Sequence, residues 1–315
     1  ARLSISAVNV IVYPDDDSMG SVTGSGSYPK GSNVTITAVP NPGYEFSHWD
    51  DGNTDNPRVF NDVQEEIEYA ASFEVAQYTL SISAGTGGIV NTIINGTYNY
   101  GTIKELIATA NEGYQFVSWS DGNLEATRSL TLTSDTTLTA SFDVIKYFIT
   151  VNAGVGGIVS GGGSYEYNSN VTISATANAG YSFNQWNDGV STSSRSIVVS
   201  SDATYTASFT LNTYTISVTS GAGGSVNSVN GTYNYGSSVE LIATPSANYH
   251  FVSWSDGNTE STRTITVSSA VNLVASFAID TYNVSVTAGT GGSVNSVNGT
   301  YDYGESVELI ATPSA

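Results

Sequence analysis

The sequence repeats itself about every 68 residues, and this period constrains the fold more than any other feature. Its tryptophans lie 70, 67 and 68 residues apart, and each closes the same phrase: GYEFSHW, GYQFVSW, GYSFNQW or NYHFVSW, ending at Trp49, Trp119, Trp186 and Trp254. An Asp-Gly follows two residues later, an Arg comes seven residues after that Asp, and each copy ends in Ala-x-Phe. Such a period predicts tandem modules that pack mainly against their neighbours.

The phrases divide the chain into four complete copies and a shortened fifth. We place the copies at 1–76, 77–145, 146–212, 213–280 and 281–315. The first copy contains an acidic insertion around Pro14–Ser18, and the fifth lacks the half that carries Tyr, Phe and Trp. Residues 217–247 and 285–315 differ at only four of 31 positions, which is typical of duplication. Because half a module cannot close a core alone, we expect the natural chain to continue past residue 315.

Each copy reads as strands with no convincing helix. In copy two, apolar and hydroxyl side chains alternate from Tyr78 to Ala84, the period of a half-buried strand. The best helical candidate, 102–110, has counterparts in the other copies that alternate like strands. Gly87-Gly88 predicts a turn with positive φ, and Asn95-Gly96 predicts a hairpin. The sequence therefore predicts an all-β fold with about six strands per copy.

The predicted core of a copy combines three segments. They are the apolar residues of the first strand, the Tyr and Phe before the Trp, and the closing triplet Leu138, Ala140 and Phe142. The core is small for the number of residues that must be ordered, so we expect neighbouring copies to stabilise one another.

The combined phrase resembles the divergent internalin-B B-repeat family. It reads Gly-Gly-x-Val, Tyr-Gly-x-x-Val, Ala-x-x-x-x-Gly-Tyr-x-Phe-x-x-Trp-x-Asp-Gly and Ala-x-Phe, and is most complete over 77–142. The resemblance implies small β-grasp-like modules in tandem in secreted or surface-attached bacterial proteins, where they act as spacers or contact surfaces. Copy one departs from the pattern because it lacks the opening Tyr, and no copy shows the helix of a full β-grasp.

Composition excludes several classes of function. With 8 basic and 28 acidic residues the formal charge is −20, which disfavours binding to nucleic acids and to anionic membranes. The absence of Cys excludes disulfides and thiolate metal sites, and no apolar run is long enough to cross a bilayer. We predict no nucleic-acid partner and no membrane insertion.

The four Trp residues have two interpretations. Exposed Trp rings could stack on sugars, whereas buried ones would belong to the core. The Trp lies five residues after the Tyr of its phrase, which puts the two on opposite faces of a strand unless a bulge intervenes. The exposure of the Trp therefore stays open, and the core interpretation is favoured.

The Asp-Gly-Asn-x-Asp/Glu phrase also has two interpretations. Its alternating oxygen side chains (Asp51, Asn53 and Asp55 in copy one) resemble the start of a calcium loop, as does Asp15-Asp16-Asp17. The phrase lacks the later bidentate Glu, and Val190 interrupts it in copy three, so a hairpin turn is favoured. We interpret the recurring Asp and Arg, seven residues apart, as a cross-strand ion pair that fixes this hairpin.

We predict no catalytic, cofactor-binding or metal-binding residues and no enzymatic activity. His48 and His250 occupy non-equivalent positions, and Lys30, Lys104 and Lys146 do not recur, so none of them can serve every copy. No nucleophile elbow and no phosphate-binding loop followed by a helix is present. No cofactor is expected, with calcium as the one alternative.

The predicted function is mechanical. Four residues always separate the closing Phe of one copy from the opening Tyr of the next, so the last strand of one module can run almost directly into the first strand of the next. Such joints predict a stiff, elongated rod: an extracellular stalk or fibre-forming spacer of a bacterial surface protein or adhesin. The expected partners are neighbouring repeats, further domains of a longer chain and a filament of the same protein. The alternative is a multivalent array of binding modules for glycans or a host surface protein.

Overall fold

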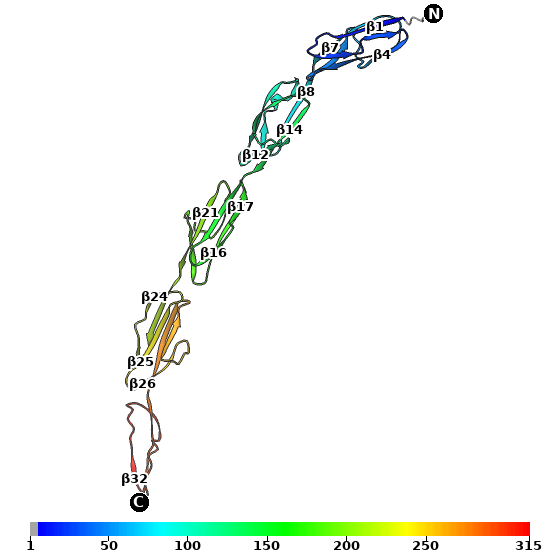
Figure 1. The fold of residues 1–315 in the computed structure, drawn as a ribbon. Coiled ribbons are helices and arrows are strands. Elements are labelled where there is room, and N and C mark those ends of the chain that lie inside the picture. Colours follow the sequence, from blue (N-terminus) through cyan, green and yellow to red (C-terminus); the bar gives the residue numbers. More distant parts are fainter. Residues whose placement is uncertain (1–5) are drawn as a thin grey trace. The chain divides into compact units, whose positions relative to one another are not determined.

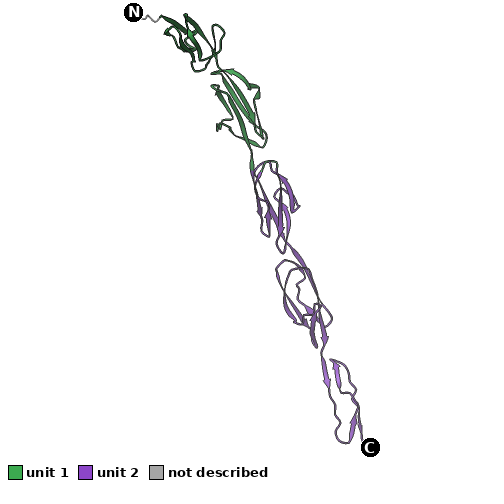
Figure 2. Cartoon of the chain, turned by 90° about the vertical axis from the view of Figure 1, so that its right-hand side faces the viewer, with its two compact units in different colours: residues 1–146, 166–168 green, residues 147–165, 169–315 purple. Residues whose placement is uncertain are grey.

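The computed structural model describes residues 6–315, which form two compact units. One contains the described residues up to 146 together with 166–168, and the other contains 147–165 and 169–315 (Figure 2; the strands are labelled in Figure 1). The described residues form strands, turns and one 3₁₀ turn, Thr92–Ile94, with no α-helix. The predicted all-β fold is confirmed, and the run 102–110 forms a strand. Within residues 6–315, no helix is long and apolar enough to cross a membrane.

Each complete repeat contains seven strands in the same order. Repeat 1 has β1 (Ala7–Pro14), β2 (Gly20–Thr23), β3 (Gly26–Pro29), β4 (Ser32–Pro40), β5 (Tyr44–Trp49), β6 (Arg58–Val63) and β7 (Ile67–Val75). Repeat 2 has β8 (Gln77–Ala84), β9 (Gly88–Val90), β10 (Gly96–Asn99), β11 (Ile103–Ala110), β12 (Tyr114–Trp119), β13 (Thr127–Thr131) and β14 (Thr136–Val144).

The later repeats follow this pattern until the sequence becomes too short for it. Repeat 3 has β15 (Lys146–Ala153), β16 (Gly157–Ser160), β17 (Gly163–Glu166), β18 (Asn170–Ala177), β19 (Tyr181–Trp186), β20 (Ser194–Val198) and β21 (Ala203–Leu211). Repeat 4 has β22 (Thr213–Ser220), β23 (Gly224–Val226), β24 (Gly231–Asn234), β25 (Ser238–Pro245), β26 (Tyr249–Trp254), β27 (Thr262–Thr266) and β28 (Val271–Ile279). Residues 281–315 have β29 (Thr281–Val284), β30 (Gly292–Val294), β31 (Gly299–Asp302) and β32 (Ala311–Pro313).

Two sheets face each other in every complete repeat. In repeat 2 one sheet has the order β10-β8-β14-β12, with the central strands β8 and β14 parallel, and the other has the antiparallel order β13-β11-β9. The central parallel pair fits the β-grasp resemblance. The layer that covers it is a three-stranded sheet, which takes the place of a helix.

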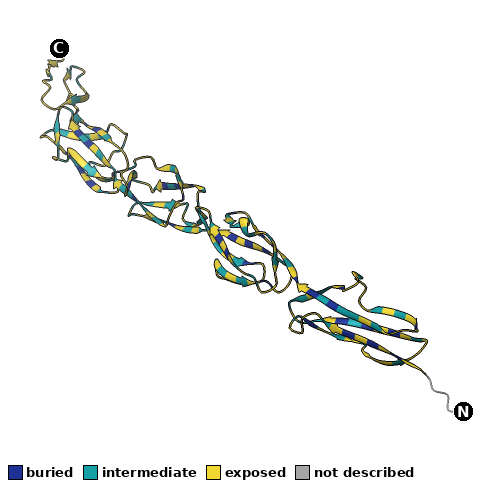
Figure 3. Cartoon of the chain, turned by 90° about the horizontal axis from the view of Figure 1, so that it is seen from above, coloured by how far each residue is buried: buried dark blue, intermediate teal, exposed yellow. Residues whose placement is uncertain are grey.

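The core of each repeat lies between its two sheets. In repeat 2 it combines Leu80, Ile82, Leu138 and Ala140 from the first sheet with Leu106 from the second. Figure 3 shows the resulting alternation of buried and exposed residues along the strands. The predicted Leu, Ile and closing-triplet positions are buried, whereas the predicted Tyr114 and Phe116 are half-buried and pack against this core.

Each complete repeat has seven strands, one more than the six predicted. The prediction that Asn95-Gly96 turns a hairpin is also wrong. The missed strand in repeat 2 is β10, which begins at Gly96 and pairs with β8, whereas β9 pairs with β11 in the other sheet. Asn95 does not turn a hairpin between β9 and β10. Its side chain accepts a hydrogen bond from the backbone N–H of Ile82 (2.8 Å) and donates one to the Ile82 carbonyl (3.0 Å). The amide thus replaces a strand residue beside β8.

Candidate functional site: the joints between repeats

A β-bulge determines where each Trp points. In repeat 2 the register between β12 and β14 shifts between Phe116 and Ser118, so one extra residue changes the parity of the strand. Trp119 therefore lies on the same side as Phe116, with ring centroids 6.1 Å apart. The same shift occurs in repeats 1, 3 and 4, and all four Trp side chains have 0% exposure. The core interpretation is confirmed, and none of these rings can stack on a sugar.

The segment after each Trp connects the two sheets and is not a hairpin. In repeat 2, β12 belongs to the four-stranded sheet and β13 to the three-stranded sheet. The Trp119 indole N–H donates to the carbonyl of Glu125 (3.0 Å), which holds the loop against the core. Arg128 donates to Asp121 (2.8 Å), so the ion pair links the loop to β13. The predicted pairing of Asp with Arg is confirmed, but the predicted hairpin and cross-strand geometry are wrong because the chain changes sheets here.

The Asp carboxylates of these loops are held in the charged form. The hydrogen bond from Arg128 lowers the pKa of Asp121, and desolvation acts in the opposite direction without reversing it. Equivalent Arg side chains lower the pKa of Asp51, Asp188 and Asp256 in the same way. The pairs recur in every complete repeat, which assigns them a local structural role.

The candidate calcium ligands already have partners within their own loops. Both carboxylate oxygens of Asp51 accept hydrogen bonds from Arg58, at 2.8 and 2.7 Å, and the Asn53 side-chain oxygen accepts one from the Asp55 N–H at 2.8 Å. In the insertion, Asp16 accepts two hydrogen bonds from Ser18, which lower its pKa. A cation at Asp51 would therefore compete with a guanidinium. Over residues 6–315, no three His, Cys, Asp or Glu side chains cluster as metal ligands.

The isolated basic residues are spread over different contacts. Lys104 lies over the ring of Tyr98 at 3.7 Å, and Lys146 lies 3.9 Å from Glu166. His250 contacts Asp280 at 2.9 Å, whereas His48 contacts Ser47 at 3.1 Å. The one His–Ser pair among these contacts, His48 with Ser47, joins adjacent residues of repeat 1, and the equivalent positions in repeats 2 to 4 carry no His.

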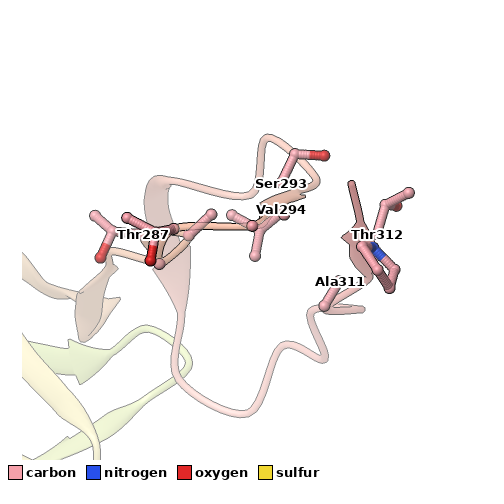
Figure 4. Close-up of a pocket in the computed structure, with 11 residues that line it drawn as sticks. Thr287, Ser293, Val294, Ala311 and Thr312 are labelled. Carbon is pink, nitrogen blue, oxygen red and sulfur yellow. The ribbon is translucent and has the colours of Figure 1, made fainter. Parts of the chain in front are cut away.

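A hollow in residues 281–315 occupies the space that a core fills in complete repeats. It has a volume of about 330 Å³ and is lined by strands β30 and β32 and by residues 287–291 (Figure 4). Leu309, whose counterpart Leu241 is fully buried, is 60% exposed here. The hollow is therefore an open half of the module.

One feature recurs at every passage from one repeat to the next: a single residue separates the last strand from the following first strand. These joint residues are Ala76, Ile145, Asn212 and Asp280. The prediction that one strand runs almost directly into the next is confirmed.

Each joint residue bonds on both sides through its backbone. The N–H of Ala76 donates to the carbonyl of Gly43 in repeat 1 (2.9 Å), and its carbonyl accepts from the N–H of Tyr100 in repeat 2 (2.8 Å). The same two hydrogen bonds, at 2.8 to 2.9 Å, join Gly113, Ile145 and Tyr167; Gly180, Asn212 and Tyr235; and Asn248, Asp280 and Tyr303. The joint residue is therefore held by both repeats.

A glycine and a tyrosine complete the joint. Gly43 has φ +90°, and a Cβ on it would overlap the ring of Tyr100. Gly113 meets Tyr167 and Gly180 meets Tyr235 in the same way. The Tyr100 ring also packs near Tyr78, with centroids 6.4 Å apart. The close approach explains why the Gly-Tyr-x-Phe phrase begins with Gly at three joints.

The fourth joint is built differently. Asn248 replaces the glycine and keeps the left-handed backbone, with φ 64°. Asn is the residue that tolerates this conformation best after Gly. The Asp280 side chain adds a contact to His250, while Asn212 at the third joint accepts a hydrogen bond from Ser182 (2.7 Å).

Both residues of the joint belong to repeated phrases of the sequence, the Gly to Gly-Tyr-x-Phe and the Tyr to Tyr-Gly-x-x-Val, and in copies two to five another Tyr precedes the latter as Tyr-x-Tyr. The second Tyr of Tyr-x-Tyr is present in copies two to five, each of which follows another copy, whereas copy one has Lys30 there. That co-occurrence was the available signal. Pairing the Tyr with a Gly of the preceding copy required the structure, since the contact crosses a repeat boundary.

Comparison with known proteins gives a family for the whole array. The family model described as the divergent InlB B-repeat domain matches residues 12–77, 78–146, 147–213, 214–281 and 282–315. No curated protein matches the sequence. Among solved structures, the Bacillus anthracis TIE protein is similar at 8% identity and a TM-score of 0.40, over 80% of this chain and 62% of that chain. The five successive matches show that the chain belongs to the divergent InlB B-repeat family.

Proposed function

We propose that this chain is a non-catalytic extracellular spacer, a stalk that holds another part of a bacterial surface protein at a distance. The observation that supports this most is the joint. A single joint residue, hydrogen-bonded to both neighbouring repeats and accompanied at three of the four joints by a Gly–Tyr contact, leaves little freedom for bending. With such joints, each added repeat makes the spacer longer by about the length of one repeat.

Two further observations support the spacer. Divergent InlB B-repeats are associated with bacterial surface proteins, and the family match covers the array from residue 12 to 315. The formal charge of −20 makes lateral association between copies of the array unfavourable. Association end to end into a filament, and attachment to further domains, are part of the same proposal.

The alternative, an array of binding modules for glycans or a host protein, stays a prediction. Its sugar-stacking version required a row of exposed Trp side chains, and the four Trp residues are buried in their repeats. The recurring Asp carboxylates of the loops after Trp are also paired with Arg, so they are not free to bind a ligand without breaking that pair.

The proposed stiffness can be tested at one joint by a distance measurement. Thr35 in repeat 1 and Thr137 in repeat 2 are exposed, and the protein has no Cys, so T35C/T137C accepts two spin labels. We expect pulsed electron–electron double resonance to give one narrow distribution of distances between the two spin labels. Tyr100→Ala should broaden it, because the ring on Gly43 is lost.

Tyr100→Phe is the matched control, since it keeps the ring and the backbone hydrogen bond and removes only the hydroxyl. It should leave the distribution unchanged. A distribution that is already broad with Tyr100 in place would mean that the joint bends freely, and the spacer proposal would then be wrong.

A further inference from the structure

The first and last strands of every complete repeat lie side by side and run parallel. In repeat 2, β8 pairs with β14 from Leu80↔Thr136 to Ala84↔Ala140, and repeats 1, 3 and 4 have the same five register pairs between their first and last strands. Both strands lie in the centre of the four-stranded sheet. The chain therefore enters and leaves each repeat through its two most deeply embedded strands.

This topology decides how a pulling force acts on a repeat. The chain enters at the start of the first strand and leaves at the end of the last. Because the two strands point the same way, these points lie at opposite ends of the pair. Tension along the chain then slides β8 against β14, so that their evenly spaced hydrogen bonds are loaded together. If the strands were antiparallel, the entry and exit points would lie at one end and the bonds would open one at a time.

Side chains on both faces of the pair oppose this sliding. Leu80, Ile82 and Leu138 are anchored in the core, with exposures of 1%, 2% and 5%. On the outer face the hydroxyls of Ser83 and Thr139 lie 2.9 Å apart. Asp135, just before β14, accepts a hydrogen bond from the N–H of Thr79 in β8 (2.7 Å). Sliding by one register position would break all of these contacts at once.

We propose that each complete repeat is a mechanical clamp that carries tensile load along the chain. This function goes beyond spacing, because a stiff spacer need not resist being pulled and a clamp need not be joined stiffly. The single-residue joints transmit the load, since they leave no slack between the last strand of one repeat and the first strand of the next.

The shortened fifth copy provides a built-in contrast. Among the described residues 281–315, β29 pairs only with β31, and no last strand lies beside it. The segment has no parallel pair to load, although residues 285–315 nearly match residues 217–247 of repeat 4. It should therefore extend at a force well below that needed for repeats 1 to 4.

The proposal can be tested by pulling the full chain from its two ends with an atomic force microscope or optical tweezers. We expect four separate unfolding steps, each lengthening the chain by about 200 Å, as a repeat of about 68 residues passes from paired strands to an extended chain. Residues 281–315 should give no step of this kind. Gradual extension without four steps would overturn the clamp.

A change of pulling direction isolates the parallel pair from overall stability. In S83C/T139C the handles are attached at the two neighbouring exposed positions, so the force separates the strands instead of sliding them. We expect repeat 2 to unfold at less than half the force needed when the same variant is pulled from its ends. Equal forces in the two directions would contradict the proposal.

Two controls separate the possible failures. End-to-end pulling of S83C/T139C with its thiols blocked should still give four steps of the same length, which establishes that the variant folds, with repeat 2 unfolding at a lower force than in the parent because the contact between the Ser83 and Thr139 hydroxyls is lost. Narrow distances at the joint together with low, direction-independent forces would leave the spacer intact and exclude the clamp. Broad distances with direction-dependent forces would do the opposite.

Discussion

Several asparagine side chains in these repeats make the hydrogen bonds that the backbone of a neighbouring strand would otherwise make. In repeat 2, Asn91 accepts a hydrogen bond from the N–H of Ile107 and donates one to the carbonyl of Glu105, both at 2.9 Å. Asn227 and Asn295 make the same two contacts in the later copies. These Asn side chains therefore share a specific role: they satisfy the backbone groups of a strand where the neighbouring strand has ended.

The joint glycines give the sharpest test at the residue scale. Gly180 and Gly189 have nearly the same left-handed φ, +79° and +85°, but only Gly180 faces a ring, that of Tyr235. Ala at either position carries a backbone penalty of roughly 1–2 kcal/mol. Gly180→Ala should lose about 1–3 kcal/mol more through overpacking, measured by thermal or urea unfolding. Equal losses for the two variants would mean that the Gly–Tyr contact contributes nothing.

The loop ion pairs predict a dependence on acid. Because Arg128 lowers the folded-state pKa of Asp121, the pair stabilises the fold above the unfolded pKa of Asp. That contribution is lost as the pH falls below about 4 and through the folded value. Since Asp121 is partly exposed, the loss should be about 0.2–1 kcal/mol per pair. Urea unfolding at pH 7 and pH 3 should show a smaller difference for Asp121→Asn than for the parent, and an unchanged difference would count against the pair.

At the scale of the element, the bulge in the strand before each Trp is the decisive irregularity. Deleting Val117 would restore regular alternation and turn Trp119 toward solvent, with a loss comparable to the roughly 3–5 kcal/mol of a buried Trp→Ala change. Val117→Ala, at a side chain that is 40% exposed, should change stability by less than about 0.5 kcal/mol. A red shift of part of the Trp fluorescence in the deletion alone is expected. Identical spectra for both variants would mean that the strand tolerates the deletion.

The strands themselves differ in how far sequence could predict them. Strand β8 was predictable because apolar residues, Leu80 and Ile82 among them, alternate with hydroxyl residues from Tyr78 to Ala84. Strand β10 has four residues, GTYN, and its Asn-Gly start looks like a turn, since a side-chain amide acting as backbone leaves no pattern. The bulge was considered as an alternative but not predicted, because one extra residue changes the facing of Trp119 without changing the composition of its strand.

The joint was predictable only in part for a related reason. The constant spacing between the closing Phe and the opening Tyr indicated that strands run on from copy to copy. The contact of Gly43 with Tyr100 joins two phrases in different copies, and neither phrase shows a period that would pair them. Short-range patterns report which face of a strand is buried, whereas contacts across a boundary depend on how complete modules meet.

At the scale of the whole molecule, repeat 4 and residues 281–315 allow nearly the same sequence to be compared in a complete and in an incomplete module. Leu241 is fully buried and Leu309 is 60% exposed, although the two lie in nearly identical sequences. Strand β25 is paired on both sides, whereas β32 pairs only with β30. Amide hydrogen exchange should therefore be slow over 238–245 and fast over 306–313. Similar protection in both segments would mean that half a module orders itself without its partner strands.

Small-angle X-ray scattering of the full chain tests the central claim, that single-residue joints hold successive repeats in an extended arrangement. It does so by measuring the maximum dimension and the radius of gyration of the particle. Each complete repeat should add at least about 25 Å, so four should give a particle of roughly 100 Å or more. The joint variant Gly180→Ala should shorten or blur that dimension, while Gly189→Ala should not. A compact particle with a radius of gyration near 20 Å, the value for a single globular domain of this length, would contradict the account.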